Sequence, residues 1–406
     1  MSYSTEDRDW IRELATRVTE AATRPEMAAI RKRWRDVNAL RKPDRAPVWC
    51  KPIGAWDEII PATTLRCTHP WLRNIERTFL QILHKVDLGD DTTISPHFQV
   101  DATITVTPAN IWGVDIRHHA SQVKGGAWAY NPPLKTEADF DKLVMPEWTW
   151  DKEASEQSLA QAQDLLGDIM QVRLNCGPSY DSASISVIAA ELRGLEQTLL
   201  DMIDQPELMH RLMGLLRDAR LKLLDFWEQT GLINPNTEEP MLCSDPIGEM
   251  PNGRATLKNC WCAGNSQELD MTSPEMWKEF CLEYQRPIFA RFGQSCYGCC
   301  ENLGRKIPGV LSIPNLRIFV CSAWTTLEVV LQHVPETYCI MWRQKASDVV
   351  MPHDESSVRH DLLDGAKRLQ GRPYQIVLRE LQTLAGHPDR LHHWTRMAIE
   401  AAEKYA

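Results

Sequence analysis

The sequence has no long apolar run and no strong concentration of positive charge. Nowhere does it approach the ~18 consecutive apolar residues that a transmembrane helix needs, so we do not expect it to span a membrane. Its first residues, MSYSTEDRDWIREL, are polar and acidic, which argues against a secretory signal and favours a cytoplasmic location. With 45 Lys and Arg against 55 Asp and Glu, the net charge is −10. Neither nucleic acid nor an anionic membrane is therefore an expected partner.

Cysteine, in contrast, is abundant. The chain has 12 cysteines and no export signal, so we do not expect a disulfide framework. In a reducing compartment such cysteines are buried small side chains, metal ligands or nucleophiles. Their positions are therefore more informative than their number.

Short apolar runs alternate with longer helical stretches after a helical arm at 1–45. The runs are 46–50, 97–106, 170–176, 255–262, 292–299, 316–321, 337–342 and 374–378. A strand–helix unit repeated eight times predicts a parallel sheet that closes into a (β/α)8 TIM barrel, here a catalytic domain over 46–406. An insertion is expected near 113–120. A doubly wound open sheet is the alternative, but no Gly-x-Gly-x-x-Gly motif follows the first strand.

The segment QSCYGCCEN at 294–302 carries the most distinctive chemistry. It lies where the fifth strand should end, and the active site of such barrels lies at the carboxyl ends of the strands. If the strand continues through Cys299 and Cys300, their side chains alternate and at least one faces the barrel mouth. Thiolates bind zinc and similar cations, so the pair predicts a metal or reactive site. We expect Cys339, on the seventh strand, as a further ligand.

Several other residues could complete this site. Glu301 and His97 are candidates for controlling protonation, and Tyr297 is a third candidate catalytic residue. A structural role for His97 in the core remains open. The remaining metal ligand is expected among Glu301, Glu380, Asp270 and His97. Candidates for contacts with a polar substrate are Asn175, Glu301, Arg343 and Glu380.

Stretches spread in order over nearly the whole chain carry a more specific signal. They include Arg33-Trp34 with Asn38, Pro43, Arg45 and Pro47-Val-Trp49; AELRG at 190–194 with the residues up to 213; YGCCE at 297–301; IPNLR at 313–317; and LQTLAG at 381–386 with the residues up to Trp394. Together they resemble the cobalamin-dependent methyltransferase branch of the uroporphyrinogen decarboxylase-like superfamily. The resemblance is strongest to the first methyltransferase of O-demethylase systems.

This resemblance implies a (β/α)8 barrel that holds zinc through cysteine. It also implies transfer of a methyl group from a small methylated donor, such as an aryl methyl ether, to cob(I)alamin on a separate corrinoid protein. Cys299 or Cys300 would be the zinc ligand of the fifth strand. The sequence departs from the family in two places. The His-x-Cys pair of the thiol-methylating members is absent, and RQKA at 343–346 stands where Lys-Pro-x-Pro is expected.

Two other functions remain open at this stage. One is a metal-free lyase that decarboxylates a polycarboxylate in an arginine-rich pocket. The other is a non-catalytic accessory protein of a corrinoid system. Zinc content separates the methyltransferase from the lyase, and methylation of a corrinoid protein separates it from the accessory protein. A homodimer is compatible with all three.

Overall fold

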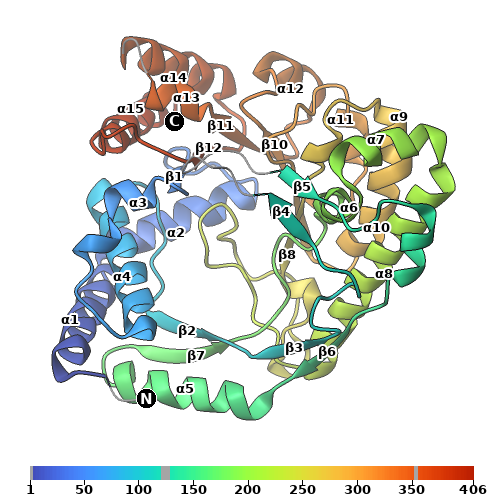
Figure 1. Ribbon diagram of the computed structural model, residues 1–406. Coiled ribbons are helices and arrows are strands. Elements are labelled where there is room, and N and C mark those ends of the chain that lie inside the picture. Colours follow the sequence, from blue (N-terminus) through green and yellow to red (C-terminus); the bar gives the residue numbers. More distant parts are fainter. Residues whose placement is uncertain (1–2, 120–128, 352–354) are drawn as a thin grey trace.

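A curled parallel sheet of six strands is the largest element of the computed structural model, which describes residues 3–119, 129–351 and 355–406 (Figure 1). In spatial order its strands are β1 (Val48–Pro52), β12 (Tyr374–Leu381), β11 (Cys339–Gln344), β10 (Leu316–Cys321), β9 (Gln294–Tyr297) and β8 (Trp261–Gly264). A separate parallel pair consists of β2 (His97–Asp101) and β7 (Gln171–Asn175). Each predicted run therefore overlaps one of these parallel strands, although the run at 255–262 shares only two residues with β8.

The expected continuous ring of eight paired strands is not what the structure shows. Within the described residues, no strand ladder joins the six-stranded sheet to the β2–β7 pair. Irregular backbone borders β8 instead, where the Ala263 N–H donates to the Tyr180 carbonyl at 2.5 Å. On the β8 side, the backbone changes direction just after β7, where Gly177 has a φ of +139° and Pro178 has no N–H to offer a ladder. The backbone directly after β7 is therefore no longer extended, and β7 does not form a ladder with β8.

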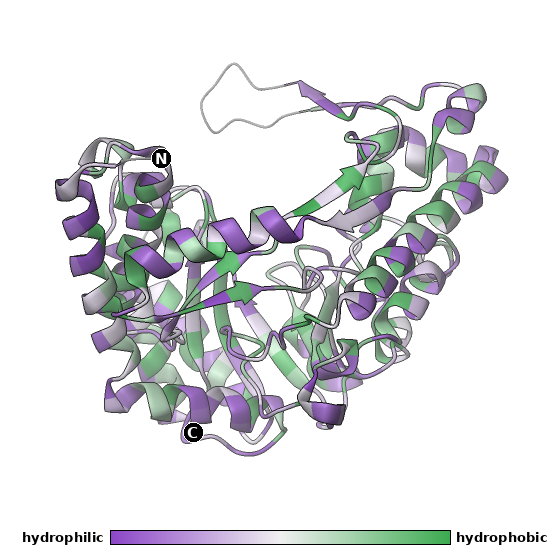
Figure 2. Cartoon of the chain, turned by 90° about the horizontal axis from the view of Figure 1, so that it is seen from below, coloured by the Kyte–Doolittle hydropathy of each residue, from purple (hydrophilic) through white to green (hydrophobic). Residues whose placement is uncertain are grey.

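Helices surround most of these strands (Figure 1). The longer helices are α1 (Thr5–Ala22), α2 (Pro25–Asn38), α4 (Pro70–Leu88), α5 (Lys152–Leu166), α6 (Ser186–Arg193), α7 (Leu195–Asp204), α8 (Pro206–Thr230), α14 (Glu355–Leu369) and α15 (Arg390–Lys404). The short ones are α3 (Trp56–Ile59), α9 (Pro274–Trp277), α10 (Glu283–Phe289), α11 (Ile307–Leu311), α12 (Leu327–His333) and α13 (Ala346–Val350). Hydrophilic and hydrophobic residues alternate along the helices in Figure 2, as one buried face requires. In the described part of the chain, no helix combines the length and apolar character needed to cross a membrane.

An insertion separates β2 from α5. It contains β3 (Ile104–Thr107), which pairs antiparallel with β6 (Glu147–Trp150). It also contains β4 (Arg117–His119), which pairs antiparallel with β5 (Ala129–Asn131) and projects from the body of the molecule (Figure 2). The insertion expected near 113–120 is therefore present and longer than predicted, although residue 120 lies outside the described residues.

The inward faces of the six-stranded sheet form a core of their own. Its members are Trp49, Trp261, Ala263, Cys296, Ile318, Val320, Cys339, Met341 and Val377, with Trp34 and Val37 of α2 and residues 241–243. The segment between α8 and β8 is fastened across this core because the Asn38 side-chain amide donates to the carbonyls of Met241 and Cys243 at 3.0 and 2.7 Å. Helix α2 therefore packs against the interior of the sheet through Trp34 and Val37.

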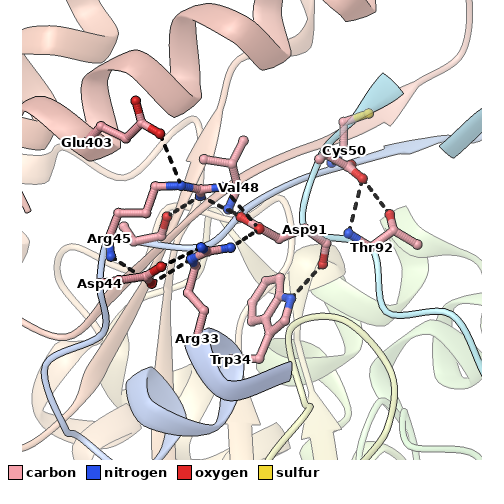
Figure 3. Close-up of polar contacts among 11 residues, drawn as sticks. Arg33, Trp34, Asp44, Arg45, Val48, Cys50, Asp91, Thr92 and Glu403 are labelled. Atoms are coloured by element: carbon pink, nitrogen blue, oxygen red, sulfur yellow. Dashed lines mark hydrogen bonds and ion pairs between the residues drawn. The ribbon is translucent and has the colours of Figure 1, made fainter. Parts of the chain in front are cut away.

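A buried ion network fixes the start of β1 against α2 (Figure 3). Arg33 pairs with Asp91 and, at 2.6 Å, with Asp44, while Arg45 pairs with Asp91 at 2.7 Å. The Val48 N–H donates to the same Asp91 carboxylate at 2.7 Å. Removing one partner from such a network leaves uncompensated buried charge. The network therefore anchors the start of β1 to α2.

Candidate functional site

The chain turns sharply at Gly298, directly after β9. This residue has a φ of +119°, and a Cβ atom there would lie 2.8 Å from the Val320 Cβ and 2.9 Å from the Leu303 Cδ1. Only glycine combines this backbone conformation with so close an approach. The expectation that Cys299 and Cys300 continue the strand and point to opposite sides is therefore wrong. Their sulfurs lie 3.6 Å apart in the loop beyond the strand.

Glu301 holds this loop in place. One carboxylate oxygen accepts the Cys299 N–H at 2.8 Å and the other accepts the Ser266 N–H at 2.9 Å. The side chain is almost fully buried, and burial raises the pKa of Glu301, whereas these two N–H donors favour its charged form. Because both oxygens are occupied by backbone donors, Glu301 positions the thiols and does not face a substrate.

Arg343 and Glu380 complete the surroundings of the thiol pair. The Arg343 Nη1 donates to the Cys299 carbonyl at 3.0 Å, lies 3.7 Å from the Cys299 Sγ, and pairs with Glu380 at 3.2 Å. Glu380 has a φ of +63°, and the register between β1 and β12 shifts at this point. As a result, Arg379 and Glu380 both lie opposite Lys51. This bulge is what directs the Glu380 carboxylate towards the thiols.

The two thiols differ in acidity. A hydrogen bond from Cys300 and the nearby Arg343 charge lower the pKa of Cys299 to about 7 against the opposing effect of burial. The same pairing, together with burial, raises the pKa of Cys300. Cys299 is therefore the thiol that ionises first, and thiolate is the form that binds metals or attacks electrophiles.

The donor atoms of Cys299, Cys300 and Glu380 could hold a metal ion. All three lie within 4.8 Å of one another. Two thiolates on a tetrahedral zinc, each at ~2.3 Å, are about 3.8 Å apart. The observed sulfur separation of 3.6 Å is close to this value. Three protein ligands with a fourth position open is the arrangement of catalytic zinc sites, so these residues fit the ion.

Cys339 and Tyr297 do not join this group. Cys339 begins β11 and is fully buried in the inner core, whereas Arg343, four residues further along the same strand, is the residue that contacts Cys299. Four strand residues span ~13 Å, which is too far for a shared ion. Tyr297 faces the surrounding helices, where its hydroxyl lies in hydrogen-bonding distance of the Ser266 hydroxyl at 2.9 Å and the Gln285 side-chain oxygen at 3.1 Å. Strand alternation turns its neighbour Cys296 inward instead.

The other polar candidates also lie elsewhere. His97 lines a different cavity, beside Trp49 and Lys51, and its buried Nδ1 has no hydrogen-bond partner. Burial and the Arg173 charge lower the pKa of His97. Asn175 donates to Asp101 at 2.7 Å, and the Asp270 carboxylate accepts the Asn302 N–H at 2.7 Å. Of the predicted residues, the structure brings together Cys299, Cys300, Arg343 and Glu380, with Glu301 behind them.

Sequence reasoning missed several residues that surround the thiols. A small cavity beside Cys299 is lined by Tyr180, Asp181, Asn265 and Arg379, among others. Burial raises the pKa of Tyr180, so its hydroxyl stays protonated at neutral pH. Tyr180 and Asp181 follow β7 in an irregular segment without a motif to mark them. Arg379 could have been found, because β12 alternates and Val377, two residues earlier, is an inward position.

Comparison with known proteins finds a similarity in the fold and none in the sequence. No family model matches the chain, and no curated protein sequence matches it. A solved structure described as a methyltransferase from Methanosarcina mazei is similar, with a TM-score of 0.52 at 9% identity over 93% of this chain and 98% of that chain. At this identity the likeness shows a shared fold across nearly the full length of both chains.

Proposed function

We propose that this chain is a methyltransferase of the uroporphyrinogen decarboxylase-like superfamily, with a (β/α)8 barrel whose ring is completed by irregular segments. It takes a methyl group from a small methylated donor and passes it to cob(I)alamin on a partner corrinoid protein in the cytoplasm. The observation that carries the proposal is the thiol pair with Glu380 beside it, at the carboxyl ends of the strands. The likeness to a solved methyltransferase supports it.

The residues of the site suit activation of a poor leaving group. A zinc ion bound by Cys299, Cys300 and Glu380 supplies Lewis-acid polarisation of the atom that loses the methyl group. Arg343 favours the thiolate form of Cys299 and compensates the charge of Glu380. The protonated hydroxyl of Tyr180 lines the same cavity and can donate a hydrogen bond to a developing negative charge.

Metal analysis of single variants tests the zinc site. We expect about one zinc per chain in the purified protein. Cys299→Ser, Cys300→Ser and Glu380→Gln should each lower its zinc content. The matched control is Cys176→Ser, because Cys176 is a buried cysteine whose pKa burial raises to about 11, away from the site. A zinc-free protein that remained fully active would refute the proposed role of the metal.

A methyl-transfer assay tests the reaction. Methoxylated aromatics, thiols and methylamines should be offered with cob(I)alamin, both free and on a corrinoid protein. We expect the absorption spectrum of methylcobalamin to appear only when this protein is present. A spectrum that never changes with any donor would contradict the proposal.

One observation favours the lyase as a second candidate. Arg343 and Arg379 line the cavity beside Cys299, and Lys51 lies opposite Arg379, as a pocket for an acidic substrate would require. A decarboxylase would release carbon dioxide from a polycarboxylate without zinc or corrinoid. Loss of carbon dioxide release in zinc-free protein would therefore argue against it.

A further inference from the structure

Three neighbouring strands place a cation towards the interior near their carboxyl ends. On β1, the inward residue Trp49 is followed two positions later by Lys51. On β12, Val377 is followed by Arg379, and on β11, Met341 is followed by Arg343. Since side chains alternate along a strand, all three cations face the space above the inner core.

The three cations differ in how completely nearby acidic groups neutralise their positive charge. Arg343 is buried and its Nη1 pairs with Glu380 at 3.2 Å, although its Nε, like that of Arg379, is buried with no hydrogen-bond partner. Arg379 reaches the same carboxylate only at 3.9 Å, and its Nε is buried with no hydrogen-bond partner. Leaving a buried donor unpaired is costly, so such a group is normally satisfied by a ligand or by water.

Lys51 strengthens the case for a ligand. Burial lowers the pKa of Lys51, and the Arg379 charge lowers it further, so these two cations repel each other across the bulge. The acidic groups that act on Lys51 are Glu239 and Asp181. Burial raises the pKa of Glu239, which weakens its ability to neutralise the pair. An anion between Lys51 and Arg379 would remove the repulsion and satisfy the open guanidinium.

We propose that Lys51 and Arg379 form a subsite for the carboxylate of the methyl donor, next to Cys299, Cys300 and Glu380. The inference rests on the proposed function and narrows its substrate class to small organic carboxylates. Arginine offers carboxylates two parallel N–H donors, and lysine adds a point charge. Arg379 lines the cavity beside Cys299, which measures about 40 Å³, whereas Lys51, opposite Arg379 on β1, lines the cavity that also contains His97. One water needs ~10–15 Å³, so the cavity beside Cys299 admits a carboxylate group and not a whole aromatic ring.

Calorimetric titration of the full chain with 4-methoxybenzoate tests the subsite, with 4-methoxybenzamide as its neutral counterpart. We expect the carboxylate to bind and the amide to bind much more weakly. Lys51→Met and Arg379→Met should each weaken carboxylate binding by about 10- to 100-fold, as expected for a lost charged hydrogen bond. Arg379→Lys should restore part of the affinity, because it keeps the charge.

The matched control is Arg317→Met. Arg317 is a partly buried cation at the start of β10, at the opposite end of the sheet, and its removal should leave binding unchanged. Equal affinity of the wild type and both subsite variants would overturn the inference. So would binding of inorganic phosphate without binding of 4-methoxybenzoate.

The double variant Cys299→Ser, Cys300→Ser separates this inference from the proposed reaction. The carboxylate should still bind to it, because Lys51 and Arg379 are intact. If binding persists while even the wild type transfers no methyl group, the proposed reaction fails and the carboxylate subsite stands. If the wild type transfers methyl groups from neutral donors and binds no carboxylate, the reaction stands and the subsite fails.

Discussion

Replacing Glu301 by glutamine should separate the positioning of the thiols from the binding of metal. The native carboxylate accepts two backbone N–H groups, from Cys299 and Ser266. The amide keeps one oxygen acceptor and presents an NH2 group to the other N–H. One of two bonds to a charged acceptor is therefore lost, which costs about 1.5–3 kcal/mol of folding free energy.

The same change should weaken metal binding. The N–H group of Cys299 is one anchor of the loop that holds the two sulfurs 3.6 Å apart. Changing a residue that orients metal ligands typically lowers metal affinity by about 10- to 100-fold. Zinc affinity can be measured by competition with a chromogenic chelator, and the free energy of unfolding by urea titration of the metal-free protein.

The matched control is Glu380→Gln, which changes a ligand directly. The Glu380 side chain is 34% exposed, but the buried Arg343 would lose its carboxylate partner, so Glu380→Gln should also lower the free energy of unfolding. Both variants are therefore expected to lower stability and zinc affinity, and the loss of zinc affinity should be larger in Glu380→Gln, because only this variant removes a charged donor atom of the metal site. Unchanged zinc affinity in Glu301→Gln would refute the positioning role.

Two further predictions concern buried charge and thiol reactivity. Asp91→Asn should lower the free energy of unfolding by about 3–5 kcal/mol, because Arg33 loses a buried partner. The control Asp168→Asn, which breaks an exposed ion pair, should cost about 0–1 kcal/mol. Equal urea midpoints for the two variants would contradict this prediction. Alkylation of Cys299 by iodoacetamide can be followed by mass spectrometry in the metal-free protein. Its rate should rise with pH, with a midpoint near pH 7, because the thiolate is the reactive form and predominates above the pKa of Cys299. Arg343→Gln should move that midpoint upward, and a midpoint that stayed in place would exclude an electrostatic role for Arg343.

The order of strands and helices could be predicted because it depends on local patterns. The apolar run at 316–321, for example, coincides with β10. Where a strand stops depends on contacts made elsewhere in the chain. The run at 292–299 looks continuous, yet β9 ends at Tyr297 because Gly298 packs against Val320 and Leu303. Val320 lies on the next strand, 22 residues further along the chain, so the local pattern gave no sign of this contact.

Which face of a strand points inward was harder to predict. The strands of a parallel sheet are covered on both sides, so inward and outward positions are equally apolar. Cys296 faces inward and Tyr297 outward, but either choice fits the composition of β9. The same ambiguity made Cys339 a plausible ligand, although it lies at the wrong end of β11. Glu380 was among the predicted ligands, but the sequence pattern did not favour it over Glu301, because its position depends on a single bulge.

The bulge in β12 also fixes the spacing between the proposed carboxylate subsite and Glu380. Arg379 and Glu380 are adjacent residues, and their Cα atoms are separated by one peptide unit of ~3.8 Å. An unbulged strand would turn one of the two side chains away from the interior. With both facing inward, the separation between a carboxylate bound at Arg379 and the Glu380 side of the metal site is limited by the backbone of β12. Among isomeric methoxybenzoates, only those whose methyl group lies at the matching distance from the carboxylate should then react.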